Sequence, residues 1–492
     1  MKRIACVLLC LCLILGVFSG CGNDYLSQYI YFKLDTAPVT LDPQSASSES
    51  ELLIARNLYE GLLRKSDSGA IVCGACKDFD KKGLTYTFNL REDIVWNDGT
   101  PVTADDFVFG IQRGLDPATK SPFANRLLSI KGAKEFNRGS ADASLLGIKA
   151  LNDKTLKIEL EFDDPDFKSA LTTSVAMPCN RDFFEQSGGK YGRDVDNILS
   201  NGSYFIAKWN KEEFGIRLYK NEEYNGEFVS QNAAVFLSLD HEEGVIDLLH
   251  DNTIDMTLLD NADIAKAKEK GFKIHSVNNI CWVLTLGDQF NDNIKKALAL
   301  AISQEKALGD GFSVAGSIYP DIIKENTSED IAIQFAYDIE TAKQILSAEI
   351  SKSPDKKFPQ TTLYYYEDAA FKPCVTAVVG HWQKNLSAFI NIEASNNLSA
   401  LSKELTAGEL PLAIFPVYAK STSGAEYLIN YGLDLHGSNK TFYDAQQEIL
   451  KGNKIIPLAY EKTNIVCTDV IKEVYIDDEN GYIDFSFIVK QD

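Results

Sequence analysis

The sequence predicts an α/β fold, because segments with strand periodicity alternate with segments of helical periodicity along the chain. Apolar residues alternate with polar ones over residues 86–90 and again over residues 156–162, the pattern of half-buried strands. Apolar residues recur at helical spacing over residues 294–302 and 339–350. The chain has 492 residues, more than one ordinary core accommodates, so two or more domains are expected.

The N-terminal residues have the pattern of an export signal. Lys2 and Arg3 precede an apolar run over residues 4–17, which has the length of a signal-peptide core and is short for a membrane-spanning helix. Small residues then lead to Cys21, an arrangement that resembles the bacterial lipobox, where the cysteine is acylated and becomes the new N-terminus. We expect residues 1–20 to be a lipoprotein signal peptide and Cys21 to carry lipid. An ordinary signal peptide that is cleaved nearby is the alternative.

The cysteines that follow offer one suggestive spacing. Cys73 and Cys76 are separated by two residues, which is typical of metal or redox sites. Neither a second cysteine pair nor a histidine pair lies near enough in the sequence to complete a zinc site. A local disulfide or two free thiols are therefore favoured over a metal centre.

The strand over residues 86–90 is followed by a turn and a helix. The segment at residues 97–100 reads NDGT, which is typical turn chemistry. Thr103 is a natural helix N-cap, and Asp105 and Asp106 in the first turn favour the helix dipole. The second strand pattern, over residues 156–162, comes next in the chain. The helix expected over residues 294–302 follows a capping-type Asn291, so predicted strands and helices alternate along the sequence.

Net charge excludes one class of function. Lys and Arg number 49 against 70 Asp and Glu, which leaves a net charge of −21. A nucleic-acid-binding surface requires a basic stripe, so no nucleic-acid partner is expected. The sequence contains no HExxH, GxSxG, P-loop or dinucleotide-binding motif, and its five histidines are scattered. We expect neither an enzyme nor a metal or other cofactor.

Four short blocks carry a specific resemblance. They are NLYEGLL at 57–63, YTFNLRE at 86–92, WNDGTPVTADDFV at 96–108 and NGSY at 201–204. They closely resemble the family 5 extracellular solute-binding proteins of ABC transporters, the oligopeptide- and dipeptide-binding group. The resemblance covers essentially the whole chain after the signal segment.

The resemblance implies a two-lobed periplasmic-binding-protein type II fold with an extra subdomain in the first lobe. Lobe I is expected to be discontinuous, built from residues 21–59, 183–277 and 460–492, with residues 60–182 as its inserted subdomain. Lobe II is expected over residues 278–459 and is shorter than in the family near residues 435–441.

The implied function is that of the substrate-binding component of an ABC importer. The two lobes would close by a hinge around a peptide, and the closed form would be presented to the permease subunits. We expect a monomer without cofactor, held at the extracytoplasmic face of the cell membrane by lipid on Cys21.

The resemblance also implies where the ligand lies. The residues at cleft positions are Ser47, Ser48, Glu49, Phe123, Trp282, Val417, Tyr418, Ala419 and Lys420. Lys420 stands where the family has an aspartate that pairs with the free amine of the peptide. Because lysine repels an amine, we expect ordinary peptides to bind more weakly here than to a typical member. Glu49 is either a replacement carboxylate from the opposite lobe or a solvated side chain.

The sequence leaves two alternative functions open. The same fold could bind a non-peptide or anionic solute, such as a sugar, a metal complex or a modified peptide. Lys420 would favour a carboxylate or phosphate if it faces the cleft. Alternatively, the altered site could belong to a degenerate sensor or surface interaction protein that has lost transport.

Overall fold

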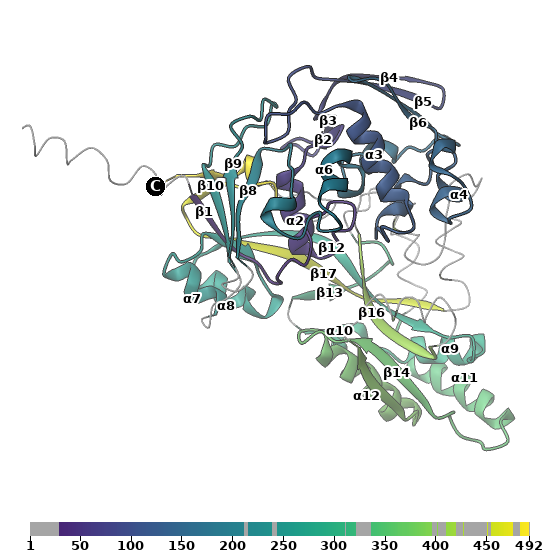
Figure 1. Ribbon diagram of the computed structural model, residues 1–492. Helices are drawn as coiled ribbons and strands as arrows, with labels where there is room; N and C mark the ends of the chain where they lie inside the picture. The colour runs from purple at the N-terminus through teal and green to yellow at the C-terminus, as the bar shows by residue number, and fades with distance from the viewer. Residues whose placement is uncertain are drawn as a thin grey trace, which may run out of the picture.

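The computed structural model describes residues 29–210, 215–238, 244–309, 311–320, 336–395, 410–419, 454–475 and 483–491, together with Leu401, Tyr427 and Leu450. One mixed sheet runs through the molecule, and α-helices lie on either side of it (Figure 1). The order of its strands is β15 (Ile390–Ser395), β14 (Thr361–Tyr366), β16 (Leu412–Tyr418), β12 (Lys273–Leu286), β17 (Ile455–Cys467), β11 (Met256–Leu258), β1 (Tyr29–Lys33), β10 (Ala234–Ser238), β9 (Gly215–Lys220) and β8 (Tyr204–Asn210), with β13 (Phe312–Val314) paired to β17.

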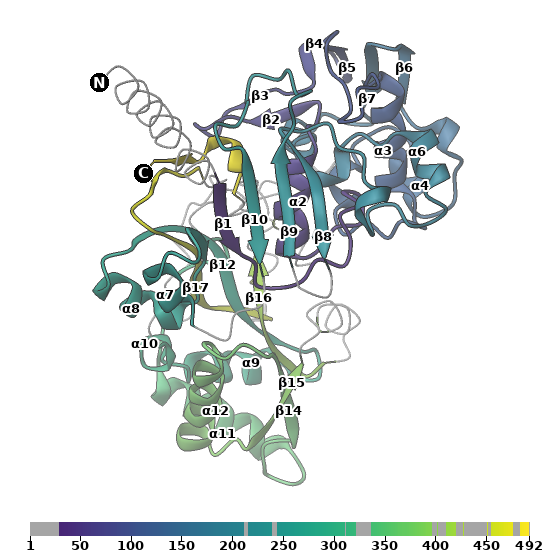
Figure 2. The same ribbon diagram turned by 60° about the vertical axis from the view of Figure 1, so that its left-hand side comes forward.

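Strand directions in this sheet are mixed. β1 is parallel to both β10 and β11, and β14 is parallel to both β15 and β16. β12 is antiparallel to β16 and β17, and β8, β9 and β10 are antiparallel to one another. Figure 2 shows β1, β10, β9 and β8 side by side. The α/β class expected from the sequence is confirmed.

Two large hydrophobic cores divide the described residues. The first contains residues from 30 to 256 and from 465 to 488, and the second contains residues from 280 to 459. The second core holds β14 and β16 with the helices α9 (Asp292–Leu300), α10 (Gln304–Ala307), α11 (Ile339–Lys352) and α12 (Lys372–Leu386). Figure 1 shows these helices grouped in one part of the molecule, away from α2, α3, α4 and α6.

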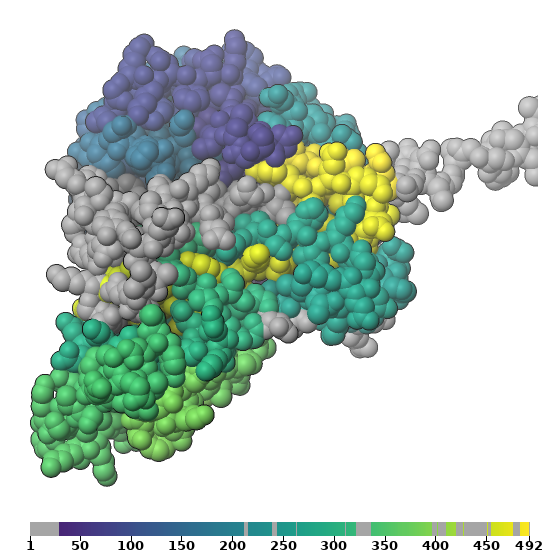
Figure 3. Space-filling model, turned by 180° about the vertical axis from the view of Figure 1, so that it is seen from behind, coloured from purple at the N-terminus to yellow at the C-terminus, as the bar shows by residue number. Residues whose placement is uncertain are grey.

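The long strands β12 and β17 join the two cores. Their register runs from Lys273 opposite Cys467 to Thr285 opposite Ile455, and it shifts between Asn278 and Ile280. Within β17, core residues belong to the second core up to Ala459 and to the first core from Ile465, and β12 contributes to the second core from Ile280 onward. The register shift therefore lies at the transition, where a bulge bends a strand pair. We call the part of the molecule around the first core the first body and the part around the second core the second body. Figure 3 shows C-terminal residues, in yellow, both against the first body and between it and the green second body.

A separate four-stranded sheet lies beside the first core. Its order is β4 (Cys76–Lys82), β5 (Thr85–Leu90), β7 (Thr155–Glu159) and β6 (Ile148–Asn152), and α3 (Ala104–Leu115) packs against β6 and β7. The predicted cap is confirmed, because Thr103 and Asp106 form a capping box at the start of α3. Within α3, a Cβ on Gly110 would lie 2.1 Å from the carbonyl oxygen of Met177, so only glycine permits this close approach.

The remaining elements are short. β2 (Leu63–Lys65) pairs with β3 (Ile71–Cys73), and Cys73 is disulfide-bonded to Cys76. This settles the alternatives in favour of the local disulfide. The other helices are α2 (Glu49–Leu58), α4 (Ala133–Asn137), α5 (Phe167–Ala170), α6 (Arg181–Gln186), α7 (Val245–His250) and α8 (Ile264–Glu269), and the last strand pair is β18 (Ile471–Glu473) with β19 (Val489–Lys490).

Buried ion pairs attach the C-terminal segment to the first core. Arg64 lies 2.7 Å from Asp484 and 3.4 Å from Glu60, and Arg91 lies 2.9 Å from the other oxygen of Glu60. Lys490 lies 2.8 Å from Asp255. Each of these buried carboxylates has a cation beside it, as burial of a charge requires.

Candidate functional site

A cleft of about 420 Å³ lies where the two cores meet. The first body contributes the residues after β1 and β11 and the first residue of α2, while the second contributes the end of β16 and the loop before α12. The strands β12 and β17 form its floor. The lining residues are Asp35, Glu49, Leu258, Leu259, Asp260, Asn261, Ile280, Trp282, Asp368, Ala369, Ala370, Tyr418, Glu461, Lys462, Thr463 and Asn464.

Glu461 of β17 is held in place by two hydrogen bonds. Trp282 Nε1 donates to one carboxylate oxygen at 2.6 Å, and Asn261 Nδ2 donates to the other at 2.7 Å. The indole of Trp282 is itself fixed, because it is 1% exposed and stacks on Phe371 with ring centroids 3.9 Å apart. Trp282 therefore reaches the cleft wall but serves to position Glu461.

Burial and like charges act together on Glu461. Its burial, with contributions from Asp368 and Asp260, raises the pKa of Glu461 to about 7, against the lowering effect of the hydrogen bonds from Trp282 and Asn261. The carboxylate therefore titrates near neutral pH.

Other groups in the cleft respond to the same negative field. Burial raises the pKa of Tyr418, and the charges of Glu49, Glu461 and Asp368 raise it further. Burial also raises the pKa of Asp35, with Asp260 adding to the effect and Lys33 opposing it. The described lining holds five carboxylates and one lysine, so the cleft is an acidic environment.

Only some of the residues predicted at the cleft line it in the structure. Glu49, Trp282 and Tyr418 line it. Ser47 and Ser48 are instead used to start α2: their backbone N–H groups donate to Glu51 at 2.9 and 3.1 Å.

Val417 and Ala419 are buried beside the cleft. Val417 lies opposite Cys281 in the β12–β16 register, and the N–H of Ala419 donates to the carbonyl of Asn279 at 2.8 Å. Lys420 and Cys21 lie outside the described residues, as does the expected shortening near residues 435–441.

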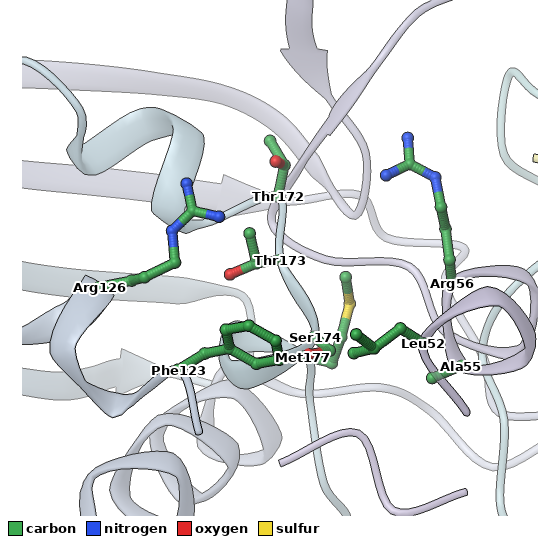
Figure 4. A pocket seen from close by; sticks show the side chains of 9 residues that line it. All are labelled: Leu52, Ala55, Arg56, Phe123, Arg126, Thr172, Thr173, Ser174 and Met177. Atoms are coloured by element: carbon green, nitrogen blue, oxygen red, sulfur yellow. The ribbon is translucent and has the colours of Figure 1, made fainter. Parts of the chain in front are cut away.

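Phe123 lines a different, smaller cavity of about 40 Å³ in the first body. Figure 4 shows Arg126 and Arg56 on opposite sides of it, with Phe123, Thr173 and Met177 between them. Arg126 donates to Ser169 Oγ at 3.2 Å, and Arg56 lies 3.9 Å from Asp484. Helix α2 connects the two places, because its first residue lines the cleft while Leu52, Ala55 and Arg56 line this cavity.

Sequence reasoning missed Glu461, Asp368 and Asn261. Glu461 had a signal: it is the one carboxylate within residues 455–467, an otherwise mostly apolar strand. A charged residue on a buried strand calls for a functional or structural partner. Asp368 and Asn261 carry no comparable pattern.

The described residues contain neither a cluster that could hold a metal nor a helix that could span a membrane. Over that part of the chain, no three His, Cys, Asp or Glu side chains are placed to hold a metal ion. Among the helices so described, none has both the length and the apolar character needed to cross a membrane.

The sequence model described as "Bacterial extracellular solute-binding proteins, family 5 Middle" matches residues 63–439. The Oligopeptide-binding protein OppA of Bacillus subtilis is 26% identical over 387 residues, covering 74% of this chain and 70% of that protein. The Periplasmic oligopeptide-binding protein OppA of Salmonella typhimurium is 31% identical over 375 residues, covering 72% and 68%.

Solved structures show the same fold. Listeria monocytogenes OppA bound to peptide superposes with a TM-score of 0.79 at 20% identity and covers 94% of this chain and 99% of its own. The pheromone receptor PrgZ gives a TM-score of 0.79 at 21% identity and covers 94% and 100%. This likeness confirms the type II periplasmic-binding-protein fold.

Proposed function

The chain belongs to family 5 of the bacterial extracellular solute-binding proteins, and from this membership we propose that it is the peptide-binding component of an ABC importer. The names of the relatives state oligopeptide binding for those proteins, and the acidic cleft offers a place for a ligand here. Its role is capture and delivery without catalysis.

One observation carries this proposal: the cleft is lined from both cores at once. Asp35 and Glu49 come from the first body, and Asp368 and Tyr418 come from the second. A ligand that touches both bodies favours the arrangement in which they are close together. Binding is thereby coupled to closure about β12 and β17, which is the signal a permease can recognise.

The location follows from the N-terminal sequence. We propose that residues 1–20 are removed on export and that Cys21 is acylated, which anchors the monomer at the outer face of the cell membrane beside its permease. Mass spectrometry of the N-terminal peptide from native cells tests this, since a diacylglyceryl-modified Cys21 is expected. An unmodified N-terminus at another residue would refute it.

Ligand class is tested on the chain that begins at Gly22. Thermal unfolding is measured with a pool of random tri- to pentapeptides and, separately, with a panel of sugars. A peptide present at 100 times its dissociation constant should stabilise the folded state by about 2.7 kcal/mol. Stabilisation by sugars with no effect of any peptide would replace the peptide proposal with the sugar alternative.

A further inference from the structure

We propose that the outer face of β1, β10, β9 and β8 lies on the surface of the anionic bilayer to which the protein is tethered. We call this surface the aromatic face. It consists of the aromatic and basic side chains that these strands turn away from the first core: Tyr29, Tyr31, Phe205, Tyr219 and Phe236, with Lys33, Lys208 and Arg217. None of these residues lines the cleft, so the aromatic face is a surface separate from the proposed ligand site.

Alternation along the strands decides which side chains face outward. The residues at the intervening positions belong to the first core: Ile30, Phe32, Tyr204, Ile206, Ile216, Leu218, Val235 and Leu237. The register places Tyr31 opposite Phe236 and Phe236 opposite Arg217, so these three residues share the other side of the sheet. Figure 2 shows the four strands in the foreground with α2 behind them, and none of the described helices crosses in front. Tyr219 is 39% exposed on this side.

The aromatic rings of this face pack on one another instead of against a helix. The ring centroids of Tyr29 and Tyr31 lie 5.2 and 5.1 Å from that of Phe236. The rings of Phe205 and Tyr219 lie 6.3 Å apart. Each tyrosine has an apolar ring and a polar hydroxyl, a combination that is favoured at the boundary between lipid headgroups and acyl chains. The cluster therefore has the chemistry of a surface that lies in a bilayer interface.

The charge of these strands contrasts with that of the whole chain. The chain has 70 acidic and 49 basic residues, yet β1, β8, β9 and β10 contain no Asp or Glu. Their basic residues are Lys33, Lys208, Arg217 and Lys220. Arg217 is exposed and lies 5.4 Å above the ring of Phe236, so basic and aromatic groups are adjacent. Asp255, which accepts from the backbone N–H of Tyr31, is buried and lies 2.8 Å from Lys490. The aromatic face thus complements negatively charged headgroups.

The N-terminal tether ends on the same face. β1 begins at Tyr29, and Cys21 lies eight residues before it. An extended chain spans at most about 3.6 Å per residue, so an acylated Cys21 holds Tyr29 within about 29 Å of the bilayer. This reach rests on the proposed acylation of Cys21, whereas the aromatic and basic character of the face does not.

A second copy of the chain fits the aromatic face less well. In a symmetric dimer the same surface lies on both sides of the interface, so the basic residues of one copy would meet those of the other. Like charges brought together across an interface oppose association. An anionic bilayer instead supplies the opposite charge.

Vesicle binding tests the proposal on the chain that begins at Gly22, which lacks the lipid anchor. Sedimentation is measured with vesicles of phosphatidylcholine alone and with vesicles that also contain about 30% phosphatidylglycerol, an anionic lipid. We expect the anionic vesicles to bind the protein on the order of tenfold or more tightly than the neutral ones. In about 1 M salt, where the Debye length is about 3 Å, this difference should disappear.

Variants assign the binding to the aromatic face. Arg217→Gln should weaken binding to the anionic vesicles about fivefold, since each basic residue near an anionic surface contributes about that factor. Tyr219→Ser should weaken binding without changing its dependence on salt, because burial of a ring is not screened. Lys149→Gln, exposed on β6, removes one positive charge elsewhere and should leave the affinity unchanged.

Fluorescence shows which side of the acylated protein touches the bilayer. Tyr219→Trp adds an indole to the aromatic face, and its emission should be quenched by vesicles that contain brominated lipid, because quenching requires contact with the acyl chains. Leu84→Trp is the matched control, since Leu84 has a similar exposure of 37% in the turn between β4 and β5. Its emission should not be quenched.

The outcomes separate this proposal from that of the lipid anchor. Equal binding to neutral and anionic vesicles, equal effects of Arg217→Gln and Lys149→Gln, or equal quenching of the two tryptophan variants would overturn the membrane contact. A dimer that Tyr219→Ser disperses in sedimentation velocity would assign the face to a second copy and overturn it as well. Binding of the unacylated chain to anionic vesicles, with an unmodified Cys21 in native cells, would support the contact and overturn the anchor.

Discussion

At the scale of single residues, Glu461 combines burial, two hydrogen bonds and neighbouring negative charges in one side chain. Its pKa is raised to about 7, so the folded protein retains a proton at pH values where the unfolded chain has released it. A raised pKa of this kind contributes stability that is fully present below the ordinary value and is lost as pH rises through the folded value. The contribution of Glu461 to the stability of the free protein should therefore fall between pH 4.5 and pH 8.

Glu461→Gln tests this pH dependence. The change in unfolding free energy between pH 4.5 and pH 8 should differ between the variant and wild type by up to about 3 kcal/mol, because each pKa unit corresponds to about 1.4 kcal/mol. Urea unfolding at several pH values measures the slope. Loss of an acceptor for Trp282 or Asn261 changes the unfolding free energy by the same amount at every pH. Only the slope of unfolding free energy against pH is therefore compared. Glu393→Gln serves as control, and a slope unchanged by Glu461→Gln contradicts the assignment.

Residue 420 is a lysine, and this bears on the affinity for peptides with a free amine. Because lysine repels an ammonium, we expect such peptides to bind more weakly than peptides whose amine is acetylated. Lys420 lies outside the described residues, so this stays a prediction. Titration calorimetry with tetraalanine and N-acetyl-tetraalanine measures the difference, and tighter binding of the free-amine peptide would contradict the expectation.

At the scale of elements, α2 depends on one carboxylate for its start. Glu51 accepts hydrogen bonds from the backbone N–H groups of Val39, Thr40, Ser47 and Ser48 at 2.9 to 3.1 Å. Burial acts to raise the pKa of Glu51, but these four donors lower it. The same contacts fix Glu49, the next residue after the cap, at the cleft.

Truncation of Ser48 and of Glu51 to alanine should lower the free energy of unfolding by different amounts. Ser48→Ala removes one cap and should lower the unfolding free energy by about 1 kcal/mol. Glu51→Ala leaves four backbone donors without their acceptor and should cost about 3 kcal/mol. Glu185→Ala, exposed in α6, should stay within about 0.5 kcal/mol of wild type. Equal costs for Ser48 and Glu51 in urea unfolding would show that the carboxylate contributes nothing beyond the cap.

Replacement by alanine should have opposite effects on stability at two helical glycines. Gly110→Ala in α3 places a methyl group 2.1 Å from the carbonyl oxygen of Met177 and should destabilise the protein by about 1–3 kcal/mol. Gly380→Ala in α12 meets nothing within 4 Å and should stabilise it by about 0.5–1 kcal/mol. Thermal unfolding measures both. Destabilisation by Gly380→Ala would contradict the open environment at that helix.

At the scale of the whole molecule, the two bodies should approach each other when ligand binds. Strand β17 holds residues of both cores, and the shift in register between Asn278 and Ile280 in its partner β12 marks the place where the pair can bend. Small-angle X-ray scattering should show a smaller radius of gyration with a saturating peptide than without it. An unchanged radius despite saturation by calorimetry would contradict hinge closure.

Some features of the fold could be predicted from sequence because they rest on neighbours in the chain. Thr103 and Asp106 meet across three residues, and Asn291 accepts from Ile294 in the same way. The strand at Thr85–Leu90 and the helix at Ile339–Lys352 follow from the spacing of apolar side chains. Family membership likewise follows from contiguous blocks of residues.

The chemistry of the cleft was decided by tertiary structure alone. Its five carboxylates, at positions 35, 49, 260, 368 and 461, come from segments that are far apart in the chain and meet only where the two cores join. Phe123 and Glu49, predicted at one site, were instead separated into two cavities by helix α2. Local periodicity sets which face of an element is buried, but long-range packing sets which side chains share a cavity, and so which ligand charge that cavity favours.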